Sequence, residues 1–501
     1  MNNMSQEPKK VDRRKFIYAG LGAAIIIVGG AAIYFATKPP EVTTITSTIS
    51  TTTTTTTTSI SSTTIPTTTT VPTTTTVTQP TTTVTTITTS VAKPKGEITV
   101  PLHKPPWLTG FQSVISQYEK ANEDAKVSLS SVANITELRD KQVADAINKT
   151  GLYDLYMLNQ GMGASLLVLG GHTRKIRESD ASYEKDPNLI YYGWTYRDNE
   201  LTALPLNANN DLLYYRGDLF DEKGLKKPDT WDDVVNAAKT LHDPSKPVYG
   251  FIPRVADDPC YEWWHMLVSF GGKVFVDAEK GDFTIRVNDE HGLAATETFA
   301  ELLKYAPPEP MAITQSDIMA YMATGKGAQT LTVYANSPWM DDPTTSIIPM
   351  KIQYATPPKG VGLPNCDYGP IDFGCFSLGV SSYAKNKELA YDFAKFCTSY
   401  DAQLTLAMMG VGPVRKDVAS LPSLIANPKY RALKEQAEAL KYMKSLPHIP
   451  ELTYIHNPIG KTFVQKVVAE RNPKDALNWF AEEIYKYLTG QGFKTSWTPL
   501  K

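Results

Sequence analysis

The chain has 501 residues, 42% of them hydrophobic, which is enough for two or three domains with large buried cores. Its 50 basic and 52 acidic residues give a formal net charge of -2, so no basic excess favours non-specific binding to nucleic acid. The four cysteines show neither a Cys-x-x-Cys pair nor zinc-finger spacing, which argues against a zinc site.

The N-terminus predicts a membrane anchor. A basic segment, residues 1–15, precedes an apolar run over residues 16–36. A helix of that length is about 30 Å long and can span a bilayer, with the basic side in the cytoplasm and the rest of the chain outside. Arg13 to Ile17 also resembles a twin-arginine export signal, and the alternative is that the arginine pair is only cytoplasmic charge. No Ala-x-Ala cleavage site precedes Thr37, so we expect an uncleaved anchor.

Residues 37–94 predict a disordered stalk. From Val42 to Ser90 the chain is almost entirely threonine, with a few prolines, serines, valines and isoleucines. A segment so poor in large apolar side chains cannot bury enough surface to offset the entropy lost on ordering. Fully stretched, it reaches roughly 160 Å at about 3.3 Å per residue. Its many hydroxyl groups also suit O-glycosylation.

The first part of the folded region alternates between strands and helices. Strands are expected at residues 97–102, 127–132 and 153–158, with amphipathic helices between them, which predicts a parallel-type α/β sheet. Ligands bind such sheets beyond the carboxyl ends of the strands. The residues expected at that edge are His103 to Trp107, Asn134, Asn159 and Gln160.

The central region has clear local signals. Leu212 to Tyr215 is short and apolar enough for a buried strand, and Gly224 is placed to end a short helix. Thr230 stands three residues before Asp233, a capping box that begins a further helix. Later helices are expected after Tyr261, after Asn386 and from Asn472 to Gly490, with a strand over residues 283–287.

The order of these motifs resembles family 1 of the extracellular solute-binding proteins of ABC transporters, in its maltose-binding-protein-like branch of sugar binders. The resemblance covers about 400 residues and departs from the family at Arg216-Gly217, where the family has Asn-Lys. The segments that carry it are LPLNANNDLLYYRGDLF, PDTWDDVVNAAKTL, Gly325 to Ala328, Ser337 to Met340 and Asp372 to Val380. The anchor and threonine stalk resemble the archaeal type of this family.

The resemblance implies an α/β, two-lobed, periplasmic-binding-protein-like (type II) fold. Its hinge crossovers are expected near residues 206–210 and 375–380. Lobe I would comprise residues 95–206 and 380–420, and lobe II residues 211–374 and 421–501.

The resemblance also implies ligand-binding residues. Trp339 and Tyr261 match aromatic residues that stack on sugars, and Asn209 matches a polar contact with Asp211 beside it. For each, the alternative is an ordinary role in the core or in a solvated loop. Tyr454 and His456 lie near a further aromatic contact of the family. Trp107, Asn159, Gln160, Asp372 and Gly374 are added from their positions in loops.

The implied function is to bind a sugar or oligosaccharide, maltodextrin-like, between the lobes and to deliver it to a membrane permease. The protein would be a monomer and not an enzyme, with no catalytic residues, cofactor or bound metal. Asn134 and Asn148 head glycosylation motifs. The rival functions are a cell-surface glycan hydrolase, an adhesin and a binder of another solute.

The pairing of two cysteines and the role of three pairs of adjacent carboxylates remain to be considered. Cys366 and Cys375 could form a disulfide or remain separate thiols. The adjacent carboxylates at 232–233, 257–258 and 341–342 suggest solvated surface and no glycosidase acid pair.

Overall fold

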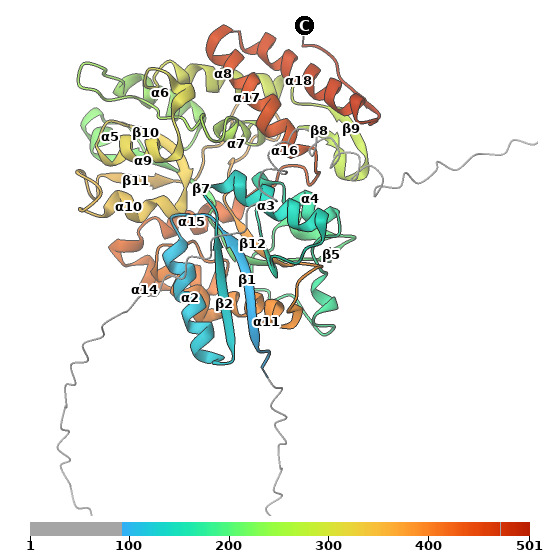
Figure 1. The fold of residues 1–501 in the computed structure, drawn as a ribbon. Coiled ribbons are helices and arrows are strands. Elements are labelled where there is room, and N and C mark those ends of the chain that lie inside the picture. The colour runs from blue at the N-terminus through green and yellow to red at the C-terminus, as the bar shows by residue number, and fades with distance from the viewer. Residues whose placement is uncertain (1–92, 471, 501) are drawn as a thin grey trace, which may run out of the picture. The chain divides into compact units, whose positions relative to one another are not determined.

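The computed structural model describes residues 93–470 and 472–500 (Figure 1). The predicted anchor and nearly all of the predicted stalk lie outside this range. Within the described residues, no helix combines the length and apolar character needed to cross a membrane.

The N-terminal strands form two small sheets next to each other. β1 (Gly96–Leu102) pairs with β2 (Ala125–Ser131) in parallel. β3 (Leu155–Leu158) follows beside β1 and pairs antiparallel with β12 (Phe376–Val380), which also pairs antiparallel with β6 (Leu204–Asn207). The prediction of a parallel sheet is therefore confirmed for β1 and β2 only, because a strand from far along the chain enters in the opposite direction.

A further sheet has the order β10 (Gln329–Val333), β7 (Asp211–Arg216), β11 (Ile352–Ala355), and all its pairs are antiparallel. One large hydrophobic core joins β7 to several helices that cluster at one end of the molecule in Figure 1. They are α6 (Trp231–Leu241), α7 (Tyr261–Ser269), α8 (Glu290–Leu303), α17 (Gly460–Glu470) and α18 (Pro473–Gly490).

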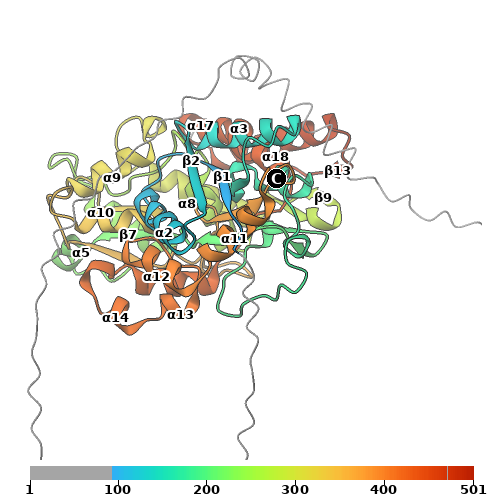
Figure 2. The same cartoon turned by 60° about the horizontal axis from the view of Figure 1, so that its bottom comes forward.

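The remaining elements surround these sheets. α2 (Leu108–Ala121) and α11 (Lys387–Cys397) share a core with β1 and β12, whereas α15 (Leu433–Ala439) packs against β7. Figure 2 shows α12 (Tyr400–Met408) next to α13 (Lys416–Ala419). The other elements are α3 (Ile135–Asn148), α4 (Ala164–Leu169), β4 (Tyr196–Arg197), β5 (Glu200–Leu201), α5 (Gly217–Lys223), β8 (Phe275–Asp277), β9 (Asp282–Ile285), α9 (Gln315–Ala323), α10 (Ser337–Asp341), α14 (Pro422–Ile425), α16 (Leu452–Tyr454) and β13 (Thr495–Ser496).

The helix ends follow the local sequence signals. The Thr230 hydroxyl accepts a hydrogen bond from the Asp233 amide, and the Asp233 carboxylate accepts one from the Thr230 amide. Gly224 ends α5 in the left-handed conformation at φ 64°, and Asn472 caps α18. These predictions are confirmed because each depends on neighbouring residues alone.

The two predicted crossovers lie side by side. Residues 208–210 lead from β6 in one sheet to β7 in the other, and β12 begins directly beside β6. The Phe376 amide donates to Asn207 Oδ1 at 3.0 Å, and the Ala208 amide donates to the Gly412 carbonyl at 2.8 Å. The chain therefore passes from β6 to β7 through a hydrogen-bonded segment, and residues 376–380 of the second predicted crossover form β12 beside it.

All four cysteines are free thiols in the structure. Of the two possibilities for Cys366 and Cys375, separate thiols are the one observed. Cys375 is buried, and Cys366 is half-buried with its thiol 3.6 Å from the Phe270 carbonyl.

Candidate functional site

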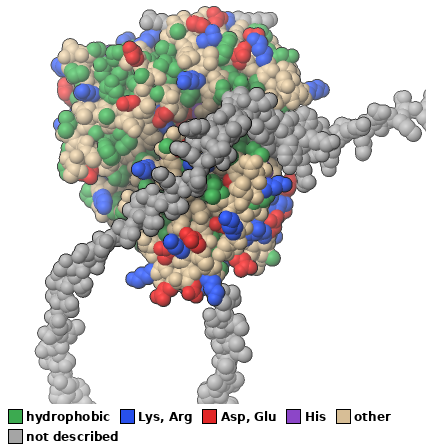
Figure 3. Space-filling view, in the orientation of Figure 1, with side chains coloured by type: hydrophobic (Ala, Val, Ile, Leu, Met, Phe, Trp, Pro, Cys, Tyr) green, Lys and Arg blue, Asp and Glu red, His purple; other side chains and the backbone are tan. Residues whose placement is uncertain are grey.

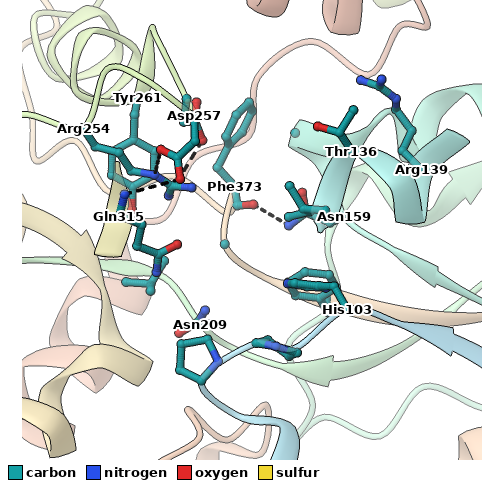
Figure 4. Close-up of a pocket in the computed structure, with 18 of the residues that line it drawn as sticks. His103, Thr136, Arg139, Asn159, Asn209, Arg254, Asp257, Tyr261, Gln315 and Phe373 are labelled. Carbon is teal, nitrogen blue, oxygen red and sulfur yellow. Dashed lines mark hydrogen bonds and ion pairs between the residues drawn. The ribbon is translucent and has the colours of Figure 1, made fainter. Parts of the chain in front are cut away.

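A cavity of about 100 Å³ lies where loops from both groups of sheets meet the crossovers. In Figure 4, Arg254, Asp257, Tyr261 and Gln315 face Thr136, Arg139 and Asn159 across it. Other residues of its lining are His103, Trp107, Asp258, His456, Asn457 and, from the crossover segments or next to them, Asn209, Phe373, Gly374 and Phe376. Residues distant in sequence thus converge on one polar space.

Arg254 is fixed at one wall of the cavity. Its Nε donates to Asp257 Oδ1 at 3.0 Å, and its Nη1 lies 3.9 Å from Asp258 Oδ2. The guanidinium carbon sits 4.8 Å from the centroid of the Tyr261 ring, in a cation–π contact. Arg254 is only 9% exposed, so these contacts orient it firmly.

Tyr261 belongs to a buried network behind the cavity wall. Its hydroxyl donates to Asp211, whose other carboxylate oxygen lies 2.8 Å from His265 Nε2. Burial raises the pKa of Tyr261 well above its ordinary value, so the hydroxyl keeps its proton and acts as a donor. The Tyr261 hydroxyl is therefore committed to the protein interior.

His456 forms a second buried connection. The Trp264 indole N–H donates to His456 Nδ1 at 2.8 Å, so this nitrogen accepts and Nε2 is directed at Asp258 Oδ1, 2.8 Å away. Burial acts to raise the pKa of Asp258, but His456 and Arg254 outweigh it and hold the pKa below its usual range. Asp258 is thus an ionised acceptor beside the cavity.

His103 lies on the opposite side of the cavity. Burial lowers its pKa to about 4, so the imidazole is neutral near pH 7. A neutral imidazole has one nitrogen that donates and one that accepts. That pair of roles matches a hydroxyl group, which can also do both.

The asparagines at the site hold the crossovers in place. Asn159 Nδ2 donates to the carbonyls of Phe373 and Cys375, and Asn209 Oδ1 accepts from the Ala335 amide at 2.9 Å. A Cβ at Gly374 would overlap the Asn209 carbonyl, so only glycine allows the segment before β12 to approach Asn209 this closely.

His103, which was expected at the ligand-facing edge of the sheet, lines this cavity, and so do six of the eleven residues predicted to bind the ligand. They are Trp107, Asn159, Asn209, Tyr261, Gly374 and His456. Their side chains are nearly all buried, and several form internal hydrogen bonds. The same residues therefore line the cavity and support its wall.

The other five do not line it. Asp211 is fully buried behind Tyr261, and Gln160 clamps the Leu446 backbone through both its amide nitrogen and its amide oxygen. Asp372 accepts from the Trp194 indole and from Ser445, and Tyr454 stacks on Tyr487. Trp339, on α10, is 46% exposed and lies outside the lining.

The sequence did not single out Arg139, Arg254, Asp257 or Gln315. The default assignment of Asp257 and Asp258 to solvated surface is wrong for Asp258, whose side chain is 15% exposed and paired with His456. The run Arg254 to Asp258 carried a signal, an arginine with carboxylates three and four residues later, but exposed ion pairs show the same pattern.

The family can be stated from comparison with known proteins. Residues 113–432 match the family model described as bacterial extracellular solute-binding protein, and the chain belongs to this family.

The described residues contain no group of three or more His, Cys, Asp or Glu side chains placed to hold a metal ion.

Curated relatives are distant but extensive. The chain is 24% identical over 387 residues to the galactooligosaccharide-binding protein of Bacillus subtilis, covering 74% of this chain and 85% of the relative. It is also 24% identical over 368 residues to the mannitol-binding protein of Pseudomonas aeruginosa, covering 68% and 81%. Both are binding proteins.

Solved structures show the same fold. A solute-binding protein from Agrobacterium radiobacter in complex with ribitol has a TM-score of 0.68 at 24% identity, covering 79% of this chain and all of that one. Maltose-bound MalE3 of T. maritima also gives 0.68, at 21% identity, covering 78% and 100%. The chain therefore has the two-lobed mixed helix and sheet architecture of these binding proteins.

Proposed function

We propose that this protein is the extracellular sugar-binding component of an ABC importer. It takes up a sugar or oligosaccharide in the cavity between its lobes and delivers it to a permease in the membrane. It catalyses no reaction itself. The relatives whose names specify galactooligosaccharides and mannitol support a ligand rich in hydroxyl groups.

The observation that carries this proposal is the pairing of Arg254 with Asp257 at the cavity. A carboxylate accepts from hydroxyls and a guanidinium donates to them, so the pair suits vicinal hydroxyls of a sugar. His103 and Asn159 lie on the opposite wall, so a ligand in the cavity would touch both lobes.

Contacts of the ligand with both walls would favour closure of the two lobes around it. A ligand that is held by both walls binds the closed form more tightly than the open form, and only this difference shifts the population. The crossovers at residues 206–210 and 375–380 serve as the hinge. Lobe I comprises residues 95–206 and 380–420, and lobe II residues 211–374 and 421–501.

The rest of the chain places the binding domain outside the cell. Residues 16–36 anchor the protein in the cell membrane by a single N-terminal pass, as in the archaeal type of this family, and residues 37–94 form a stalk. The binding domain is an extracellular monomer. Asn134 and Asn148 are both exposed and are acceptors for glycans.

Isothermal titration calorimetry with the full chain tests the proposal. At least one sugar or sugar alcohol should bind, and Asp257→Asn should weaken it by about 10- to 100-fold, because charge-assisted hydrogen bonds contribute about 1.5–3 kcal/mol. The control is Asp232→Asn, a change at an exposed carboxylate on α6, which should leave affinity unchanged. Failure of every sugar to bind would refute the proposal.

A further inference from the structure

We infer that the ligand is a single-unit neutral polyol, a five- or six-carbon sugar or sugar alcohol that is recognised through its hydroxyls and not by stacking. This inference rests on the proposed function and narrows its substrate class. It follows from how the aromatic rings, the volume and the charges of the cavity are arranged.

On the side of β1, no aromatic ring of the cavity lining offers an open face. Trp107 is 2% exposed, with its ring centroid 6.0 Å from that of Phe111 and 5.1 Å from that of Phe376. Phe376 in turn lies 6.2 Å from His103. Stacking on a sugar requires a free ring face, and the protein already packs against these rings.

The rings on the other side are covered as well. Tyr261 is 1% exposed and carries the Arg254 guanidinium on its ring. Phe373 packs against His456 with centroids 5.0 Å apart, and Gly161 lies so close that a Cβ there would be 2.7 Å from the Phe373 ring. Arg254 thus occupies the surface on which the resemblance would place a sugar ring.

The volume points in the same direction. The cavity is open to solvent and has a volume of about 100 Å³. Pockets for drug-sized ligands measure roughly 300–1,000 Å³. A space below that range favours one small unit with many hydroxyls over a chain of several rings.

The charges at the cavity are balanced. Arg254 is paired with Asp257, and Arg139 Nε donates to Asp140 at 2.8 Å. His103 is neutral near pH 7. A ligand with its own net charge would disturb these pairs, whereas a neutral polyol can donate to the carboxylates and accept from the guanidinium. Figure 3 shows Lys, Arg, Asp and Glu interspersed on the face drawn, without one dominant sign.

Trp339 is an exposed aromatic residue that the proposed recognition of the ligand does not use. It is the one tryptophan among the exposed large hydrophobic residues of the described chain, and it stands outside the cavity lining. We therefore expect a single unit held in the cavity to be bound without Trp339.

Calorimetric titration of the full chain with two sets of probes tests the inference. The single units are ribitol, D-mannitol, D-galactose and D-glucose, and the chains are maltose, maltotriose and raffinose. We expect at least one single unit to bind at least about tenfold more tightly than every chain. A chain that binds as tightly as the best single unit overturns the inference but leaves the proposed function intact. Binding of none of the probes counts against the proposed function as well.

Variants separate stacking from hydrogen bonding for the best probe. Asp257→Asn should weaken its binding by at least about tenfold, whereas Trp339→Ala should change it by less than about twofold. A tenfold loss on Trp339→Ala, with Asp257→Asn unchanged, would show that stacking outside the cavity determines affinity and would overturn the inference.

Discussion

Replacement of Tyr261 by phenylalanine separates support of the cavity wall from contact with the ligand. The change keeps the ring under Arg254 and removes only the hydroxyl that donates to Asp211. Asp211 is fully buried and would lose one of its donors, which costs about 2–3 kcal/mol for a hydrogen bond to a buried carboxylate. With about 400 folded residues and an unfolding entropy of about 2.1 cal/mol/K per residue, the melting temperature should fall by about 2–4 °C.

Scanning calorimetry measures that loss, and isothermal titration measures ligand affinity in the same variant. Because the hydroxyl points into the protein, affinity should change by less than about threefold. Tyr305→Phe is the matched control, since its hydroxyl donates to Glu301 at 2.9 Å in a half-exposed position, and its cost should be about 0.5 kcal/mol. Unchanged stability of Tyr261→Phe, combined with a large loss of affinity, would refute the reasoning.

Three further changes have defined outcomes. Burial raises the pKa of Asp372 from 3.8 to about 7, so between these values the unfolded chain releases a proton that the folded chain keeps, and stability falls as pH rises. Asp372→Asn removes this contribution, and thermal melts at pH 5 and pH 8 should differ less in the variant than in the wild type; an equal difference would contradict the assignment. Gly374→Ala should cost about 1–3 kcal/mol in denaturant unfolding, because the new Cβ overlaps the Asn209 carbonyl, whereas Gly490→Ala, with open space around it, should not destabilise. Thr230→Ala removes a helix cap and should cost about 1 kcal/mol in the same assay, and no loss would show that the capping box adds nothing to stability.

Local signals in the sequence predicted much of the secondary structure. The capping box at Thr230, the left-handed Gly224 and the asparagine cap at Asn472 all mark helix ends where the structure has them. Each depends on interactions within a few residues, which are visible in a single sequence.

The order and direction of the strands were harder to predict from the sequence. The alternation of strands and helices predicted a parallel sheet, but β12 enters between β3 and β6 in the opposite direction. No local pattern specifies the direction of a strand that arrives from more than a hundred residues away along the chain. Only the packing of the complete fold determines it.

The candidate site was also only partly predictable from the sequence. Loop position and resemblance identified Tyr261 and Asn209 near the cavity, but the roles of their atoms depend on partners elsewhere in the chain. The Arg254 guanidinium covers the Tyr261 ring, and Asp211 takes its hydroxyl. Because of these contacts, Tyr261 forms part of the cavity wall and does not offer its ring for stacking. The contacts depend on how the chain folds, so a single sequence does not reveal them.

The most direct test of the central claim is a crystal structure of the protein with its tightest-binding polyol. We expect one small ligand between Asp257 and His103, with its hydroxyls hydrogen-bonded to the carboxylate and with no aromatic ring stacked against it. A ligand seated on Trp339, or bound anywhere outside this cavity, would contradict the claim.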